Sequence, residues 1–379
     1  MVSITWLHLS DLHFKTEKDR DQDRVLRALL KDIAKMTSDR GVIISENRKF
    51  LFTPSFVLVS GDIAYSGEEH QYTKAEQFMS EVWERVDMTK ELGCRRTYMV
   101  PGNHDIMRKR PPDSDKEGYR RSDHDHLSGK KDAKSFHDFL KEIWEEESYR
   151  RRLFDKFQQY EKFIAHFSAN NHPNFNYTGP SFIKFVPLGG TSEQNGEDSP
   201  VGVEIAGLCT AWIGGRDNED GTLVVGPYQI DDIESNRRVQ TTKKVLTRIA
   251  ILHHPFRAIH DFDVESTRKR LSKLFDFLLF GHLHREYFHQ EVTPECSTFH
   301  FSAGACYDHP FLKNSYNIVQ LKIGEESDIQ SMTVCTRVYR RDANEFTGDY
   351  SRYRGLGEGI VSMPKECLDL HNKIRNRDT

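Results

Sequence analysis

The sequence lacks the paired cysteines that mark a disulfide framework or a zinc site built from thiolates. Its six cysteines are scattered along 379 residues, and none of them forms a Cys-x-x-Cys pair. In a chain of this size, that pattern is typical of reduced thiols packed inside a cytosolic protein. We therefore expect free cysteines and a cytoplasmic location.

Long apolar runs and a strong net charge are also missing. The strongest apolar run, 274–280, contains Asp276 and is far too short to span a bilayer. The first residues lack the basic-then-apolar organisation of a signal peptide. The formal net charge of −4 gives no sign of a strongly basic nucleic-acid binder, although it is compatible with a local basic patch. We expect no membrane partner.

The chain also has no internal repeat, no low-complexity stretch and no linker rich in Gly, Pro or Ser. Hydrophobic residues make up 37% of the sequence and charged residues 30%, which fits a globular protein. The sequence therefore predicts one domain over residues 1–345, followed by a C-terminal tail at 346–379.

A short apolar run followed by a polar loop recurs along the first hundred residues. Such runs occupy residues 2–9, 55–60 and 96–100, and amphipathic helical patterns separate them. Strand, helix, strand, helix, strand in this order predicts parallel strands with right-handed crossovers.

The second half of the sequence is rich in β-strand patterns, which predict another sheet facing the first. Together with the helical patterns, they indicate an α/β fold of four layers, stacked as helix, sheet, sheet, helix. The expected strands are 181–187, 201–213, 248–255, 275–280, 297–303, 315–323 and 330–340.

Residues of about 106–175 interrupt this pattern and predict an insertion. Residues 106–130 are charged and turn-rich, which indicates an exposed loop. From 133 to 170, apolar residues such as Phe136, Phe139 and Phe157 repeat at spacings of three and four. That stripe needs a partner surface, so we expect a helical cap packed on the core.

Metal-ligand residue types follow five of the predicted strands. Ligands gather at the carboxyl ends of strands in α/β sheets, where separate loops converge. In an extended segment, residues i and i+2 point the same way, so each Asp-x-His or His-x-His doublet can face one site. The candidates are Asp11, His13, Asp62, Asn103, His253, His282 and His284.

This donor set of carboxylate, carboxamide and imidazole suits manganese, iron or zinc rather than calcium. Seven donors exceed the three or four that a single catalytic zinc takes from protein. They fit two divalent ions about 3.5–4 Å apart that share one carboxylate, an arrangement used to hydrolyse phosphate esters. We expect two ions, with manganese favoured and iron or zinc as alternatives.

The ordered blocks Asp-x-His, Gly-Asp, Gly-Asn-His-Asp, His-x-Pro and Gly-His-x-His resemble the calcineurin-like metallophosphoesterase superfamily. In their residues, the blocks are similar to those of bacterial cyclic-nucleotide phosphodiesterases and of the DNA-exonuclease branch. The resemblance implies a β-sandwich flanked by helices. The insertion at 106–175 exceeds the compact core of the family.

The resemblance also implies a role for each residue. One ion would be bound by Asp11, His13, Asp62 and His284. A second ion would be bound by Asp62, Asn103, His253 and His282, with Asp62 bridging. His104 would contact the phosphate or protonate the leaving oxygen, and Asp105 would orient His104.

Two neighbouring histidines need separate interpretations. His253 stands two residues before Pro255, as in the family pattern, and is the expected ligand. Adjacent side chains of an extended segment point to opposite sides, so His254 would be a residue that faces the substrate or supports the ligands, or a packed histidine.

The leading functional hypothesis is a metal-dependent phosphodiesterase whose substrate is a nucleotide or a nucleic acid, bound through Asn103, His104 and His254. The alternatives are a DNA or RNA nuclease whose insertion forms the substrate channel, a phosphomonoesterase, and a non-catalytic scaffold that keeps the fold. The sequence leaves the substrate, the metal, the oligomeric state and the role of the insertion open.

Overall fold

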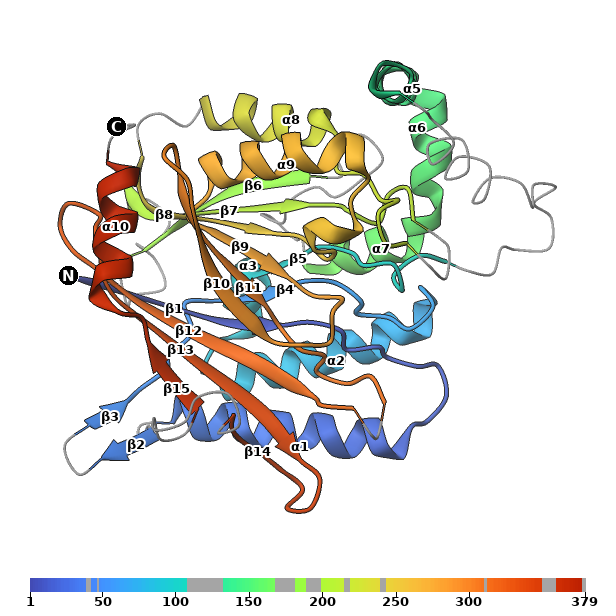
Figure 1. Cartoon of the computed structure of the whole chain (residues 1–379). Helices are drawn as coiled ribbons and strands as arrows, with labels where there is room; N and C mark the ends of the chain where they lie inside the picture. Colours follow the sequence, from blue (N-terminus) through green and yellow to red (C-terminus); the bar gives the residue numbers. More distant parts are fainter. Residues whose placement is uncertain are drawn as a thin grey trace.

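Four layers of secondary structure, two sheets between two sets of helices, make up the computed structural model (Figure 1). This is the α/β arrangement that the sequence predicts. Within the part of the chain that is described, no helix is long and apolar enough to cross a membrane. The described residues are 1–38, 42–45, 48–107, 132–167, 181–188, 199–214, 219–238, 243–309, 312–349 and 359–376.

The first sheet is built around three parallel strands near the N-terminus. β1 pairs in parallel with β4, and β4 pairs in parallel with β5, as the alternation of strands and helices predicts. β12 and β13 extend the sheet with antiparallel pairs on the other side of β1. In spatial order, its main strands are β14 (Glu345–Gly348), β13 (Ile329–Arg340), β12 (Ser315–Ile323), β1 (Val2–Leu9), β4 (Phe56–Val59) and β5 (Thr97–Met99).

The second sheet takes its strands from the middle of the chain. The expected strands at 315–323 and 330–340 form as predicted, but they join the first sheet and not the second. The reason is that β1 offers a free edge along its whole length, which β12 fills from Val2 to His8. In spatial order, the second sheet contains β10 (Tyr287–Val292), β11 (Ser297–Ser302), β9 (Phe277–Phe280), β8 (Lys244–Ile251), β7 (Val201–Leu208) and β6 (Ser181–Pro187).

Alternate residues of the central strands enter two different cores. In β1, the side chains of Ile4 and Trp6 pack between the two sheets, whereas Leu7 and Leu9 pack beneath the helices. Successive side chains of a strand point to opposite faces, so a strand that is covered on both faces must be apolar throughout. This explains why the sequence shows short continuous apolar runs.

Helices cover the outer face of each sheet (Figure 1). The Asp19 side chain caps the first helix by accepting hydrogen bonds from the backbone N–H groups of Asp21 and Gln22. A small separate hairpin joins β2 (Val42–Ser45) and β3 (Arg48–Phe50). The first sheet is covered by α1 (Arg20–Thr37), α2 (Glu69–Arg85) and α3 (Lys90–Arg96), and the second by α8 (Pro227–Arg238) and α9 (Asp261–Leu274).

The insertion forms a helical cap, as its aromatic stripe predicts. Tyr72 of α2 stacks on Phe163 with ring centroids 5.0 Å apart, and Phe136 stacks on His260 at 4.7 Å. The cap therefore contacts both helical layers, and Phe136 and Phe157 are fully buried. It consists of α5 (Ala133–Glu145), α6 (Glu147–Phe154), the short 3-10 helix η1 (Asp155–Phe157) and α7 (Gln158–Phe167).

The C-terminal residues belong to the sandwich. The boundary expected between 345 and 346 falls inside β14, which pairs with β13. β15 (Ile360–Ser362) also pairs with β13, and α10 (Lys365–Arg375) packs on β13 and β11. Secondary structure therefore continues beyond the predicted domain limit, because the edge of the first sheet offers it a partner.

A buried ion pair fastens α1 to the first sheet. The Arg337 guanidinium on β13 donates two hydrogen bonds to the Asp32 carboxylate on α1, at 2.8 and 2.7 Å. The Tyr316 hydroxyl on β12 donates a third, at 2.8 Å. Arg337 is fully buried and Asp32 is 5% exposed, so loss of either partner would leave a charge without compensation.

We therefore expect Arg337→Met to lower the free energy of unfolding by about 3–5 kcal/mol. Adding Asp32→Leu in the same chain should restore most of that loss, because the unpaired carboxylate is then removed. The matched control is Arg340→Met, which breaks the exposed pair with Asp342 and should cost at most about 1 kcal/mol. Urea denaturation measures all three variants, and equal losses for Arg337→Met and Arg340→Met would contradict the role of the buried pair.

Candidate metal centre

The candidate ligands lie where five strands end at one edge of the two sheets. Backbone hydrogen bonds join the loops: the N–H of Asp11 donates to the carbonyl of Gly61, and the N–H of His13 to that of Asp62, both at 3.0 Å. The N–H of Gly281 donates to the carbonyl of His253, also at 3.0 Å. Loops far apart in sequence are thus held in a fixed arrangement before any ligand binds.

The two doublets face the site with a backbone conformation different from the predicted one. Asp11, His13, His282 and His284 are not extended; their φ angles are 53°, 49°, 63° and 49°. Asp62 shares this left-handed conformation, with a φ of 51°. Left-handed backbone is uncommon for residues other than glycine, although Asp and His adopt it more readily than most, and it concentrates at functional sites. The two doublets are therefore not extended, contrary to the prediction, but their side chains do converge on one site.

Glycines allow the loops to approach one another closely. A Cβ atom on Gly102 would lie 2.1 Å from Oδ1 of Asp62 and 2.7 Å from Nε2 of His253. A Cβ atom on Gly61, which has a φ of 95°, would lie 2.4 Å from Nδ1 of His253. The glycines of the Gly-Asp and Gly-Asn-His-Asp blocks thus leave space for the candidate ligands themselves.

Three candidate histidines are held by the same kind of contact. The Nδ1–H of His13 donates to the carbonyl of Tyr307 at 3.1 Å, and that of His253 donates to the carbonyl of Ser60 at 2.6 Å. The Nδ1–H of His284 donates to the carboxylate of Asp308 at 2.7 Å. Because carbonyl and carboxylate oxygens accept only, each contact requires a proton on Nδ1, so Nε2 is the nitrogen that can bind a metal ion.

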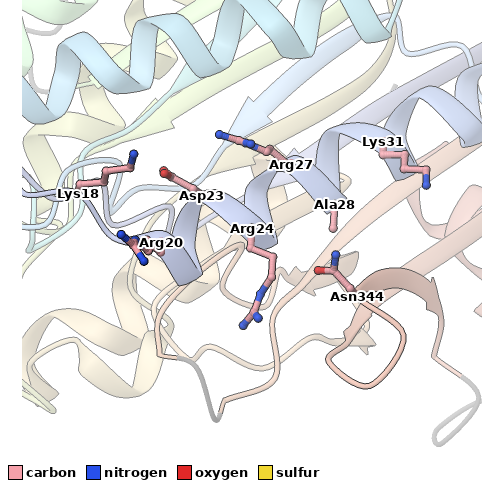
Figure 2. A pocket seen from close by; sticks show the side chains of 8 residues that line it. All are labelled: Lys18, Arg20, Asp23, Arg24, Arg27, Ala28, Lys31 and Asn344. Atoms are coloured by element: carbon pink, nitrogen blue, oxygen red, sulfur yellow. The ribbon is translucent and has the colours of Figure 1, made fainter.

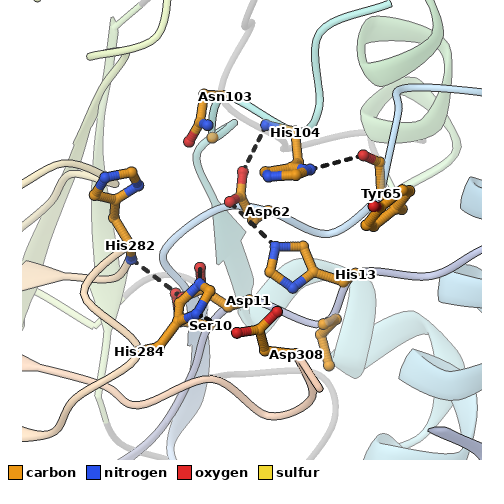
Figure 3. Close-up of polar contacts among 12 residues, drawn as sticks. Ser10, Asp11, His13, Asp62, Tyr65, Asn103, His104, His282, His284 and Asp308 are labelled. Atoms are coloured by element: carbon orange, nitrogen blue, oxygen red, sulfur yellow. Dashed lines mark hydrogen bonds and ion pairs between the residues drawn. The ribbon is translucent and has the colours of Figure 1, made fainter. Parts of the chain in front are cut away.

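The Nε2 atoms of His13 and His284 turn toward the buried carboxylates (Figure 3). Nε2 of His284 lies 3.1 Å from Oδ1 of Asp11, and Nε2 of His13 lies 3.3 Å from Oδ2 of Asp62. Nε2 of His253 lies 3.2 Å from the same Oδ2 of Asp62. Asp62 therefore lies between two histidines that come from different sheets.

The donor atoms form four overlapping groups, each within 4.8 Å, that could hold metal ions. Asp62 belongs to two of these groups, and Asp11 also belongs to two. Imidazole nitrogens and carboxylate oxygens in this mixture, without thiolates, fit divalent manganese, iron or zinc. The groups are Asp11/His13/His284, Asp11/Asp62/His253, His13/Asp62/His104 and His253/His254/His282.

His253 and His254 lie on the same side of the site, contrary to the expectation for an extended segment. Their Nε2 atoms lie 3.2 and 3.1 Å from Oδ1 of Asn103, and their ring centroids are 4.5 Å apart. β8 ends at Ile251, so the chain is no longer extended at this point. The Oγ1 of Thr210 lies 2.7 Å from Nδ1 of His254 and fixes its ring.

His104 and Asp105 occupy different positions. The Nδ1–H of His104 donates to the carbonyl of Tyr65 at 2.7 Å, and its backbone N–H donates to Oδ1 of Asp62 at 2.8 Å. The Asp105 carboxylate lies below and accepts from the backbone N–H groups of Ala64 and Gly102, both at 2.9 Å. The Tyr65 carbonyl therefore orients the His104 ring, and Asp105 ties two ligand loops together.

Charges and burial together set the pKa values of these groups. Burial favours the neutral form of His284, but the charges of Asp11 and Asp308 raise its pKa to about 11. His253 is also buried, yet the charge of Asp62 raises its pKa to about 9. Burial, with the neighbouring histidines, lowers the pKa of His282 to about 3. Without a bound cation, positive histidines therefore balance the buried carboxylates.

The contacts that hold the ligands in place are the part of the site that the sequence motifs do not reveal. Ser60 and Tyr307 contribute backbone carbonyls, which carry no sequence signature. Asp308 lies 24 residues beyond His284 and belongs to none of the five blocks. His8 packs inside the sandwich, with Nε2 2.9 Å from Oγ of Ser60. The polar loop at 108–131 lies outside the described residues.

A known protein family matches most of this chain. The family model described as calcineurin-like phosphoesterase matches residues 4–286, about three quarters of the chain. The chain belongs to the calcineurin-like phosphoesterase family. The match spans all five loops of the candidate metal centre, from Asp11 to His284.

Two solved structures are similar to this calcineurin-like phosphoesterase at low sequence identity. A conserved protein described as a predicted phosphoesterase from Streptococcus pneumoniae TIGR4 is 11% identical, with a TM-score of 0.31, covering 96% of this chain and 98% of that one. Vacuolar Protein Sorting 29 from Cryptosporidium parvum is also 11% identical, with a TM-score of 0.31, covering 95% and 97%. No match was found among curated proteins.

The close approach at Gly102 yields a test of the geometry. Gly102→Ala should displace the Asp62 carboxylate and lower the manganese retained after dialysis to less than half of the wild-type amount. Gly324→Ala is the matched control, because the atoms nearest to its Cβ would be those of the flexible Gln330 side chain, at 3.2 and 3.5 Å, and the Asp328 carbonyl oxygen at 3.7 Å. Elemental analysis measures the metal, and circular dichroism verifies folding. A folded Gly102→Ala protein with its full metal content would contradict the predicted displacement.

Proposed function

We propose that this chain is a metal-dependent phosphodiesterase that hydrolyses a nucleotide or a nucleic acid. The main support is a single observation: side chains from five separate loops turn oxygen and nitrogen donors to one point, with Asp62 shared between groups. Membership of the calcineurin-like phosphoesterase family agrees with this chemistry.

In this proposal, the residues of the centre divide between two divalent ions, with manganese favoured. When bound, two such ions supply Lewis acidity, which activates a water and neutralises phosphate oxygens. Asp62 would serve both ions. The first would also be held by Asp11, His13 and His284, and the second by Asn103, His253 and His282.

His104 is the proposed catalytic acid. Its Nδ1–H is engaged by the Tyr65 carbonyl, so Nε2 is the nitrogen that can contact the phosphate or give a proton to the leaving oxygen. Tyr65 thus acts as a positioning residue through its backbone. Asp105 is a positioning residue as well, because it fixes the loops of Asp62 and Asn103 through their neighbouring backbone N–H groups.

His254 and Asn103 are the proposed contacts for the substrate beside the second ion. His254 is fully buried, and its Nε2 lies 3.1 Å from Oδ1 of Asn103 and 3.5 Å from Oε2 of Glu219. The pKa of His254 is lowered, by burial first and by the charge of His253 second, which keeps the ring neutral. A neutral imidazole in this position can hydrogen-bond to a phosphate ester without adding a competing charge.

Turnover of bis-p-nitrophenyl phosphate with manganese tests the diesterase proposal directly. We expect metal-dependent hydrolysis, and we expect Asp62→Asn to lose both bound metal and activity because both ions depend on that carboxylate. The matched control is Asp87→Asn, which changes an exposed aspartate that also has a left-handed φ but lies outside the centre. Good turnover of p-nitrophenyl phosphate with no turnover of the diester would replace this proposal by a phosphomonoesterase.

A second variant separates chemistry from metal binding. His104→Ala should keep the metal content of the wild type but lower kcat by about 10²–10⁴-fold, the usual contribution of a general acid. His70→Ala, at an exposed histidine on α2, should leave both quantities unchanged. Steady-state kinetics and elemental analysis on the same samples give the two readings. A fully active His104→Ala protein would show that the acid role is wrongly assigned.

A further inference from the structure

A basic groove runs along the exposed face of α1 (Figure 2). Arg20, Arg24, Arg27 and Lys31 follow one another at spacings of four, three and four residues. At 3.6 residues per turn, this spacing places all four on one stripe of the helix, about 4.5–6 Å apart along its axis. The buried residues Val25 and Leu29 lie on the opposite face.

The groove concentrates positive charge in a chain that is acidic as a whole. It encloses about 620 Å³, and Lys18 extends the stripe at its N-terminal end. Five cations line it against a single carboxylate, that of Asp23, whereas the complete sequence has a formal net charge of −4. A local field of this kind attracts an anion even when the molecule as a whole does not.

Most of these cations form no ion pair with the residues that the structure describes. In the described part of the chain, no ion pair involves Lys18, Arg20, Arg27 or Lys31. Arg24 contacts Asp21, and that carboxylate also binds Arg341 at 2.8 Å. The stripe is therefore not explained by salt bridges that stabilise α1.

The groove connects to the metal centre through the first turn of α1. The Gln22 side chain donates hydrogen bonds to the carbonyls of Leu12 and His13, at 2.9 and 2.8 Å. The Tyr307 hydroxyl donates to the helix cap Asp19 at 3.2 Å, while the Tyr307 carbonyl holds the His13 ring. The N-terminal end of the groove thus lies beside the loop that carries His13.

An exposed aromatic ring lies beside His104, and a further cation, Lys15, lies beside that ring and pairs with Asp19, the cap of α1. Tyr65 is 46% exposed, and its ring centroid lies 5.4 Å from that of His104. The Lys15 ammonium lies 5.5 Å from the Tyr65 ring centroid. An exposed aromatic beside a path of cations is the combination that binds single-stranded nucleic acid, by stacking on bases and pairing with phosphates. An acidic peptide would use the cations but not the ring.

We propose that this groove binds the phosphate backbone of a single nucleic-acid strand and leads the strand past Tyr65 to the metal centre. Three of the five cations are arginines, whose planar guanidinium matches phosphate oxygens in pairs. This inference rests on the proposed phosphodiesterase and adds to it that the substrate is a polymer rather than a free cyclic nucleotide.

Binding is measured by fluorescence anisotropy, on the full chain in EDTA, with fluorescein-labelled 20-nucleotide single strands of DNA and RNA. About three to four phosphate contacts predict a slope of about −2 to −3 for log affinity against log salt.

The double variant Lys18→Glu with Lys31→Glu should weaken binding at least tenfold and make that slope shallower. The matched control, Lys365→Glu with Lys373→Glu on α10, reverses the same two charges and should stay within twofold of the wild type. Arg27→Gln, a single neutral change, should weaken binding threefold or more and covers the case in which the double variant fails to fold.

The proposal is supported if either strand binds tightly and the groove variants weaken that binding. Comparison of the DNA and RNA strands then identifies the preferred nucleic acid. Three results would overturn it: no oligonucleotide binding, equal weakening by the α10 control, or equal competition by polyglutamate of the same charge. Groove-dependent binding only to phosphatidylserine vesicles would assign the surface to a membrane instead. Hydrolysis of bis-p-nitrophenyl phosphate without strand binding overturns the groove alone, whereas strand binding without hydrolysis overturns the proposed phosphodiesterase alone.

Discussion

The hydrogen bond from Nδ1 of a histidine to a fixed oxygen is the contact on which the centre depends. It occurs at His13, His253 and His284, and at His104 beside them. Each bond fixes both the tautomer and the orientation of the ring, so that Nε2 points to the centre. The oxygens come from other ligand loops or their neighbours, so each ring also ties the loops to one another.

The same constraint accounts for the unusual backbone around the site. Of the eight residues other than glycine with a positive φ in the described part of the chain, five are candidate ligands. Such conformations cost of order 1–3 kcal/mol each and persist only where the surroundings enforce them. Here the two sheets and the inter-loop hydrogen bonds enforce them, and glycines such as Gly61 and Gly102 leave the necessary space. The sandwich thus acts as a rigid support for five short loops.

The sequence predicts this arrangement to the extent that the information is local. Asp62 could be named because it directly follows a buried strand within a Gly-Asp block, and the helical cap because Phe136 and Phe157 repeat at helical spacing. The pairing of β12 with β1 could not be foreseen, since a strand pattern does not specify which edge it will join. Neither could the Tyr307 carbonyl, because every residue has one and only the fold selects it. The direction of His254 was missed because its chain bends just after β8.

A crystal structure of the chain with manganese, with anomalous diffraction data, tests the central claim most directly. The account predicts two manganese peaks about 3.5–4 Å apart, with Asp62 between them. It also predicts that Nε2 of His13, His253 and His284 faces the ions while Nδ1 keeps its oxygen partner. A single peak away from Asp62, or rings turned so that Nδ1 contacts the metal, would contradict it.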